Sequence, residues 1–155
     1  MKKFRLGFYF LAIMTLGIFP QTVQANPLSA TVERIIDGDT IVLNQGGTSR
    51  TTQLACIDTP DWINGQPEPN AQNSKDRLTA MIPIGSSIQY YNLGAISGRT
   101  LVVIFNQNRN INLQMVTEGQ AQLHPRYRQT CTNSADALAA AQNNAQSQRL
   151  GIWNR

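Results

Sequence analysis

The run ATVERIIDGDTIVL, residues 30–43, holds two β-branched segments on either side of an acidic turn, Asp37–Thr40. Asp and Gly suit a tight turn, because Gly accepts a positive φ angle and the Asp side chain can hydrogen-bond its own backbone. A second acidic turn, within Ile57–Asp61, closes the next strand-like run, Thr51–Ile57. Three short strands joined by turns at this spacing predict an antiparallel meander.

The rest of the chain predicts two more strands and three helices. The strands are expected at Ser87–Asn92 and Thr100–Phe105, and the helices at Asn70–Met81, Asn110–Val116 and about 133–148. Five short strands with a helix inserted after the third are typical of the OB fold, a small Greek-key barrel. We therefore predict a β-rich α+β fold in which a five-stranded OB barrel carries three helices.

The first 25 residues have the pattern of a secretory signal peptide. Three basic residues precede the apolar run Leu6–Phe19, and small residues end the segment at Ala25. This apolar run is too short for a membrane span and lacks a stop-transfer flank. We expect cleavage after Ala25, one domain at residues 26–155, and a secreted or periplasmic protein with no membrane attachment after cleavage.

The net charge argues against a broad basic surface that binds the phosphates of a nucleic acid. The whole chain carries 13 basic and 9 acidic side chains, for a net charge of +4. Without the predicted signal peptide, ten basic side chains stand against nine acidic ones, and the net charge falls to about +1. A broad polyphosphate-binding surface is therefore not expected, and any phosphate recognition has to come from a few placed arginines.

Two cysteines, Cys56 and Cys131, lie in the part of the chain expected to be exported. Outside the cytoplasm a pair of cysteines is more often bridged than free, so we predict a disulfide between them. Closing so long a loop would stabilise the fold by about 4 kcal/mol in the chain-entropy model. The alternative is two buried, unpaired thiols.

Asp39, Asp58 and Asp61 are candidate metal-site residues, because a barrel that brings the two acidic turns side by side would gather their carboxylates. Hard carboxylate oxygens bind Ca²⁺ or Mg²⁺. The alternative is that both acidic segments are turns and nothing more. An EF-hand loop is excluded, because Ile41–Leu43 follows where that loop needs a Gly and further oxygen ligands.

Five further motifs occur along the chain in a fixed order. They are Ile36–Thr40, Leu54–Asp61, Ser97–Leu101, Asn112–Ala121 and Arg149–Trp153. In this order and at these separations, the sequence resembles the staphylococcal nuclease (thermonuclease) family over nearly the whole of the expected domain. The resemblance implies an OB barrel with Ca²⁺-dependent phosphodiesterase activity on DNA and RNA.

The resemblance also implies roles for individual residues. Asp39 and Asp58 would bind Ca²⁺ through their carboxylates, and Thr59 through its backbone carbonyl. Asp61 stands where the family has a Glu that orients or deprotonates the attacking water. Arg99 would bind the phosphate and stabilise the more negative transition state.

The chain departs from the family pattern in the phosphate-binding half of the site. Gln53 replaces an arginine, so one arm of the phosphate clamp lacks its charge, and loss of one preorganised donor can lower a rate about 10²–10³-fold. Asp61 is one methylene shorter than the family's Glu. Three arginines, Arg50, Arg126 and Arg128, are candidates to replace the missing one.

Tyr127 matches one of the family's tyrosines that line the nucleotide pocket, where a ring can stack on a base. The leading hypothesis is an exported, monomeric, Ca²⁺-dependent endonuclease that cleaves DNA and RNA with little sequence specificity, its activity reduced by Gln53. One alternative is an OB module that binds metal or nucleic acid without efficient cleavage. Another is a secreted structural domain.

Overall fold

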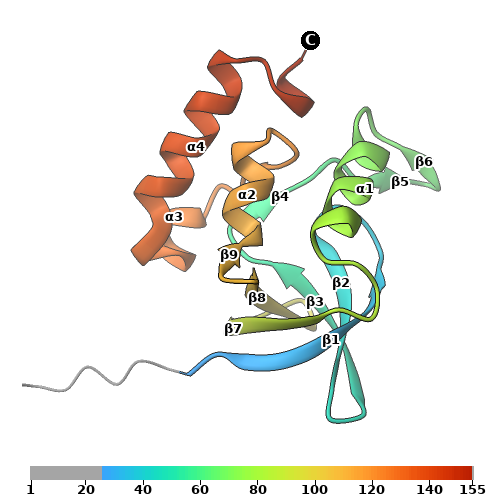
Figure 1. Ribbon diagram of the computed structural model, residues 1–155. Helices are drawn as coiled ribbons and strands as arrows, with labels where there is room; N and C mark the ends of the chain where they lie inside the picture. The colour runs from blue at the N-terminus through green and yellow to red at the C-terminus, as the bar shows by residue number, and fades with distance from the viewer. Residues whose placement is uncertain (1–25, 155) are drawn as a thin grey trace, which may run out of the picture.

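Five strands close into a barrel within residues 26–154, the part of the chain that this computed structural model describes (Figure 1). They are β1 (Leu28–Ile35), β2 (Thr40–Gln45), β3 (Thr48–Leu54), β7 (Ser87–Ile96) and β8 (Arg99–Asn106). The strands pair in the order β3-β2-β1-β7-β8, and a parallel pairing of β3 with β8 closes the sheet on itself. The predicted OB barrel is therefore confirmed, whereas the predicted signal peptide at residues 1–25 lies outside the described residues.

One face of β1 points into the barrel, because buried and exposed side chains alternate along most of the strand. Ala30, Val32 and Ile35 are buried, and the other residues of the strand are exposed. The pairing of β1 with β2 shifts register between Val32 and Arg34, as in a β-bulge. Such an extra residue changes the alternation locally and keeps Ile35 on the inner face. β1, β2 and β3 pair antiparallel in sequence, which is the predicted meander.

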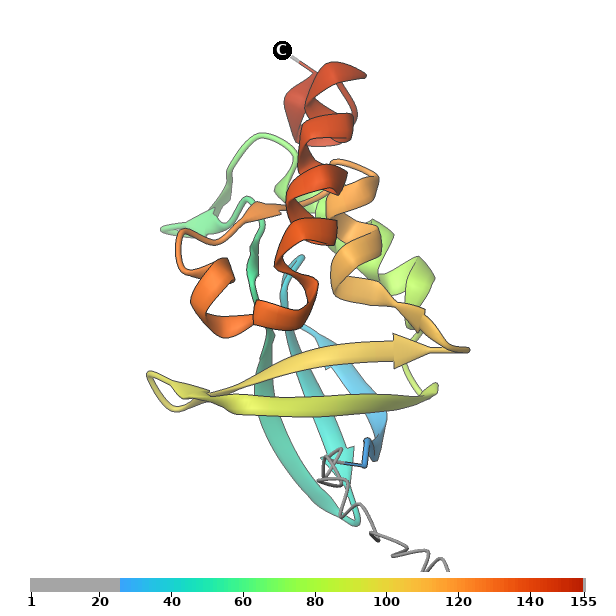
Figure 2. The same cartoon turned by 90° about the vertical axis from the view of Figure 1, so that its left-hand side faces the viewer.

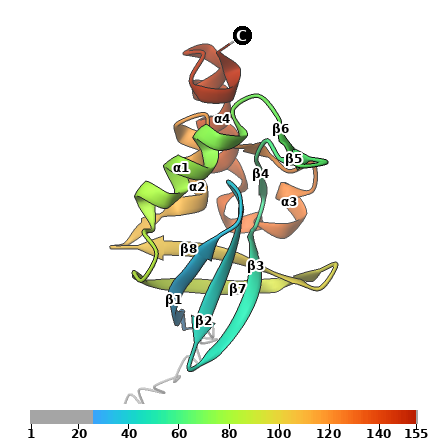
Figure 3. The same ribbon diagram turned by 90° about the vertical axis from the view of Figure 1, so that its right-hand side faces the viewer.

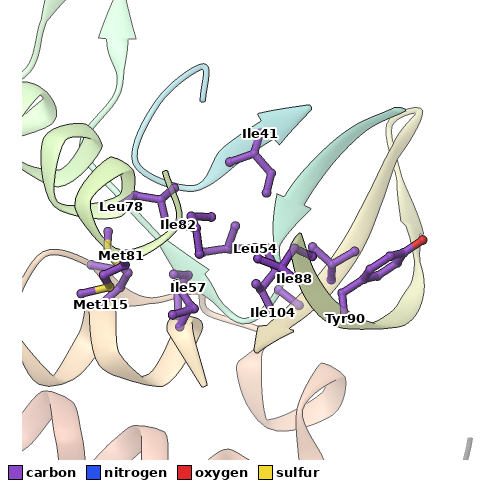
Figure 4. Close-up of a cluster of buried hydrophobic side chains, with 14 of the residues drawn as sticks. Ile41, Leu54, Ile57, Leu78, Met81, Ile82, Ile88, Tyr90, Ile104 and Met115 are labelled. Atoms are coloured by element: carbon purple, nitrogen blue, oxygen red, sulfur yellow. The ribbon is translucent and has the colours of Figure 1, made fainter. Parts of the chain in front are cut away.

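Helices gather at one end of the barrel, as Figures 1 and 2 show. They are α1 (Ala71–Met81), α2 (Ile111–Thr117), α3 (Tyr127–Thr130) and α4 (Ala135–Ser147). Figure 3 shows α1 lying beside α2 and above β1 and β2. The buried face of α1 includes Leu78 and Met81, which join Ile41, Leu54 and Ile88 in the core (Figure 4). This apolar contact holds the helices on the barrel.

Two local features differ from the prediction. The third strand ends at Leu54 rather than Ile57, because Cys56 takes a positive φ of 70° and turns the chain. The next two residues form β4 (Ile57–Asp58), which pairs with β10 (Gln122–Leu123) outside the barrel. The stretch 123–132, predicted as irregular, contains the single-turn helix α3, so the described residues hold four α-helices instead of three.

A disulfide joins Cys56 to Cys131, 75 residues apart along the chain. It ties the turn between β3 and β4 to the residue that follows α3. The His124 N–H also donates to the Cys56 carbonyl (3.0 Å). The segment that leads into the second acidic turn is thus held by a covalent bond and a hydrogen bond.

The C-terminal segment docks onto the end of α2. The Ile152 N–H donates to the Gly119 carbonyl (2.8 Å). A Cβ atom built on Gly151 would lie 2.1 Å from that same oxygen, so only glycine allows this approach. Within residues 26–154, no helix combines the length and the apolar character needed to cross a bilayer.

Candidate active site

The first acidic turn connects β1 to β2 and uses Asp37 as its structural residue. Asp37 Oδ1 accepts hydrogen bonds from the backbone N–H groups of Asp39 (2.9 Å) and Thr40 (2.6 Å). This Asx-type turn satisfies two backbone donors with one side chain. It leaves the Asp39 carboxylate free to take another role, so the two aspartates of the DGD motif have different functions.

Asp39 is buried among other acidic groups. Its side chain accepts a hydrogen bond from the Thr40 hydroxyl (2.9 Å) and is only 5% exposed. Burial, together with the charges of Asp37, Asp58 and Asp61, raises the pKa of Asp39 from its ordinary value of 3.8 to about 7, and the hydrogen bond from Thr40 acts in the opposite direction. The structure therefore brings the two acidic turns together, as the sequence predicts.

Gly38 allows the two turns to touch. A Cβ atom on Gly38 would lie 2.8 Å from the Thr59 hydroxyl oxygen and 2.8 Å from the Ser74 Cβ, so any larger residue would separate them. The Thr59 hydroxyl oxygen is buried and has no hydrogen-bond partner among the described residues. The first turn is also bound to the end of β3, because the Leu54 N–H donates to the Asp39 carbonyl (2.7 Å).

Asp58 ends β4 and is half-buried. Its partner across the two-stranded sheet is Gln122, whose side-chain amide donates to Asp58 Oδ2 (3.1 Å). The pairing holds the backbone of Asp58 while its other carboxylate oxygen stays available. The negative charge of Asp58 raises the pKa of both Asp39 and Asp61, so its carboxylate interacts with both of these groups.

Hydrogen bonds to its backbone hold Asp61 at the start of a small hairpin, which is formed by β5 (Trp62–Ile63) and β6 (Gln66–Pro67). The Asp61 N–H donates to Glu68 Oε2 (2.8 Å), and the Glu68 N–H donates to the Asp61 carbonyl (2.8 Å). Partial burial raises the pKa of Asp61, and the charges of Asp37 and Asp58 add to this effect. The hairpin thus fixes the backbone and leaves the carboxylate to the cavity.

Arg99 faces Asp61 across a cavity of about 490 Å³ that Asp37 also lines. Its charge acts against the neighbouring carboxylates and lowers the pKa of Asp61. Arg99 is the first residue of β8 and follows the tight turn at Ser97 and Gly98, both at positive φ. A cation and an acidic cluster therefore meet at one opening, although they come from distant parts of the chain.

Gln53 lies in a second, smaller cavity of about 120 Å³, which His124 and Arg126 also line. Gln53 is half-buried on β3 and pairs with Thr40, next to Asp39. Of the three candidates to replace the missing arginine, Arg126 is the one that reaches this cavity.

The other two arginines lie elsewhere. Arg50 lines a separate cavity, together with Tyr90. Arg128 pairs with Asp136 (3.1 Å), and its guanidinium lies 5.2 Å from the centre of the Tyr127 ring. Tyr127 itself packs against the core cluster, so its role in binding a base stays a prediction.

The residues around Asp39 suit a hard divalent cation. The negative charge that raises the pKa of Asp39 is charge that a cation would offset, and the buried Thr59 hydroxyl is a further oxygen without a partner among the described residues. Within residues 26–154, no three His, Cys, Asp or Glu side chains lie close enough to hold a metal ion. An ion bound by Asp39 and Asp58 would therefore need backbone or water oxygens to complete its shell.

Two residues of the larger cavity have no counterpart in the sequence prediction. Trp62 and Lys75 line it together with Arg99, and the Lys75 ammonium lies 5.5 Å from the centre of the Trp62 ring. Trp62 lies outside the strands and helices that the sequence predicts, in a segment rich in Pro and Gly. Its only signal was a large aromatic residue placed directly after Asp61 in a polar loop.

Comparison with known proteins agrees with this geometry. A family model described as staphylococcal nuclease homologue matches residues 51–155. An uncharacterized endonuclease of Haemophilus influenzae is 34% identical over 79% of this chain and 64% of its own length. The thermonuclease of Staphylococcus intermedius is 25% identical over both whole chains, and endonuclease YncB of Bacillus subtilis is 24% identical over 85% of this chain.

The family match covers most, but not all, of the residues of the candidate site. The chain spans slightly less than two thirds of the Haemophilus influenzae relative. The family match begins after Asp39 and includes Gln53, Asp58, Asp61 and Arg99. Asp39 lies outside the matched range. The close approach of Gly38 to Thr59 places the first acidic turn, which contains Asp39, against the matched part of the site.

Proposed function

Because the chain belongs to the staphylococcal nuclease family, we propose that it is an endonuclease that hydrolyses phosphodiester bonds of DNA and RNA with the help of Ca²⁺. One observation carries the proposal: Asp61 and Arg99 line the same cavity, and the charge of Asp61 also raises the pKa of the buried Asp39. An acidic group beside a guanidinium is what the hydrolysis of a phosphodiester needs, because one accepts a proton and the other binds negative oxygen.

The residues divide this work as follows. Asp39 and Asp58 would hold Ca²⁺ through carboxylate oxygens, and Thr59 through its carbonyl. Bound there, the ion would supply positive charge to a phosphate oxygen and to the developing transition state. Asp61 accepts the proton of the attacking water, and its raised pKa makes it a better base than an ordinary aspartate.

Arg99 binds the phosphate that is attacked. Its guanidinium donates to two phosphate oxygens at once, a geometry that lysine does not offer. Arg126 supports it from the smaller cavity, where Gln53 contributes hydrogen bonds but no charge. The phosphate half of the site is therefore weaker than the acidic half.

Localisation and assembly follow from the sequence prediction. The signal-like residues 1–25 support export to the periplasm or the medium. The disulfide suits an oxidising compartment, since such bonds rarely persist in the cytosol. A monomeric state, as expected from the sequence, is part of this proposal.

The test is cleavage by purified protein of single-stranded DNA and of RNA, with Ca²⁺ or with a chelator. We expect cleavage that requires Ca²⁺ and that is lost in Asp39→Ala. Asp136→Ala is the matched control, because this carboxylate is almost fully exposed on α4 and pairs only with Arg128.

A second candidate function is an OB module that binds nucleic acid without cutting it efficiently. Gln53 favours it, since this residue removes a charge from the phosphate clamp. Binding in Ca²⁺ without cleavage would support the module and exclude the enzyme. Neither binding nor cleavage would exclude both.

A further inference from the structure

Trp62 and Lys75 form a pair on the wall of the larger cavity, which Arg99 also lines. The indole is half-buried, so part of its ring is open to solvent, and the Lys75 ammonium lies 5.5 Å from the ring centre. Lys75 is the single lysine of residues 26–155. No carboxylate among the described residues lies within salt-bridge distance of it. The ring attracts the ammonium through a cation–π contact, and with no carboxylate paired to it among the described residues Lys75 can still bind an anionic ligand.

The hairpin that carries Trp62 is rigid. Its two central residues, Asn64 and Gly65, both have positive φ angles, which match the twist of a two-residue β-turn. Glu68 closes the other end through two hydrogen bonds to the backbone of Asp61. The ring is therefore held next to the carboxylate and loses little freedom when a ligand binds.

The cavity has the size and the charge for a nucleotide. Its volume of about 490 Å³ lies within the usual range of small-ligand sites. Lys75 and Arg99 are its two cations, and Asp37 and Asp61 are its acidic groups. A phosphodiester bound at Arg99 would bring the adjoining nucleotide to the wall formed by Trp62 and Lys75.

We propose that Trp62 is a stacking platform for the base next to the cleaved phosphate and that Lys75 binds the phosphate of that nucleotide. A base inside a duplex is already stacked on its neighbours and cannot lie on the indole. A single strand exposes its bases, and aromatic rings bind them with little regard to sequence. The proposal rests on the proposed function for the position of the cleaved phosphate.

The first experiment measures binding by tryptophan fluorescence, in Ca²⁺ and in the Asp61→Asn background, with a gel to verify that the oligonucleotide stays intact. The probes are a 12-residue oligothymidylate and a duplex of the same length. We expect the oligothymidylate to quench Trp62, and Trp62→Ala to weaken its binding about 10-fold or more, since stacking of one base is worth about that much. Trp153→Phe is the control and should retain the quenching.

The second experiment measures cleavage by the full chain. Trp62→Ala should raise KM for the single strand about 10-fold, leave kcat within about 3-fold, and reduce the preference for single strand over duplex. Trp62→Phe should restore most of this preference, because a phenyl ring also stacks. Lys75→Gln should lower the slope of log Kd against log salt by about 0.7.

The outcomes separate this inference from the proposed function. If the protein cleaves but Trp62→Ala binds and cleaves like the wild type, the stacking platform is wrong and the nuclease stands. If the protein never cleaves yet quenching of Trp62 depends on single-stranded DNA, the platform stands and the nuclease is wrong. If Trp62→Ala fails to fold, Trp62→Phe and Trp62→Leu decide, because stacking requires the first to bind more tightly than the second.

Discussion

Burial and neighbouring carboxylates raise the pKa of Asp39 to about 7, so the folded protein holds this proton more tightly than the unfolded chain, where the pKa is 3.8. The folded state therefore loses stability as the pH rises from about 4 to about 7, and the loss is complete above pH 7. Without a bound ion, the folded protein is therefore less stable at the neutral pH at which the site would work. A bound cation would offset the buried charge of Asp39 and restore this stability.

Asp39→Asn tests this linkage. In chelator at pH 8, the variant should be more stable than the wild type by on the order of 1–3 kcal/mol, because the amide removes a buried charge. At pH 4 the difference should be near zero, and Ca²⁺ should stabilise only the wild type. Urea unfolding at both pH values measures it. An equal difference at pH 4 and pH 8 would show that packing, not charge, explains the effect.

Gln53 is the residue at which the site departs most from its family. Gln53→Arg would add a guanidinium on β3, next to the first acidic turn, and we expect the cleavage rate to rise about 10-fold or more. Gln53→Met, which keeps the length without donors, is the control and should lower the rate. If Gln53→Arg has no effect while Arg126→Ala reduces the rate, then Arg126 already fills this role from the shared cavity.

Sequence predicts at this scale that the two acidic turns lie close together, because DGD and DTPD each follow a strand-like run, and the contact of Gly38 with Thr59 agrees; the metal-binding roles of their carboxylates stay a prediction. It does not separate Asp37 from Asp39, since only the turn geometry shows that one binds backbone N–H groups. It also misses Trp62, whose position beside Arg99 depends on contacts between distant segments.

Asn112 shows how an element positions the site from a distance. It lies on the buried face of α2 and is 3% exposed. Its Oδ1 accepts from the Ile104 N–H (3.0 Å), and its Nδ2 donates to the carbonyls of Ala55 and Val102 (both 3.0 Å). One side chain thus links α2, β8 and the turn that leads into Asp58.

Replacing Asn112 should therefore destabilise the fold. Asn112→Ala removes three hydrogen bonds to buried backbone groups, and we expect a loss of about 2–4 kcal/mol in the free energy of unfolding. Asn143→Ala, an exposed change on α4, is the matched control and should be neutral or slightly stabilising. Denaturant unfolding with unchanged m-values measures both. A loss below about 1 kcal/mol would mean that water replaces the side chain.

Elements are predictable where local patterning decides them. The five barrel strands and the helices α1, α2 and α4 follow from apolar periodicity, turn residues and helix stops in the sequence. The end of β3 does not, because a non-glycine residue, Cys56, adopts positive φ there while tertiary contacts hold the turn. The short helix α3 is equally invisible, since one turn has no periodicity to detect.

At the scale of the whole molecule, the chain is nearly neutral, and the fold places only a few basic side chains at the candidate site. Residues 26–155 carry ten basic and nine acidic side chains. Arg77 and Arg128 are already committed to Glu118 and Asp136. The two cavities of the site offer Arg99, Lys75 and Arg126 to a polynucleotide. Binding must then depend on stacking and on these few contacts, because no general positive field draws the substrate in.

This charge distribution predicts a weak dependence of binding on salt. Three phosphate contacts on a single strand give a slope of log K against log salt of about −2, far shallower than that of a basic nucleic-acid-binding surface. Arg99→Gln should reduce the slope to about −1.4, whereas Arg50→Gln should leave it unchanged, because Arg50 lines a different cavity. Titrations of oligothymidylate at several salt concentrations measure it. A slope steeper than about −4 would require phosphate contacts well outside the two cavities, and the polynucleotide would then have to follow a longer path over the barrel than the site provides.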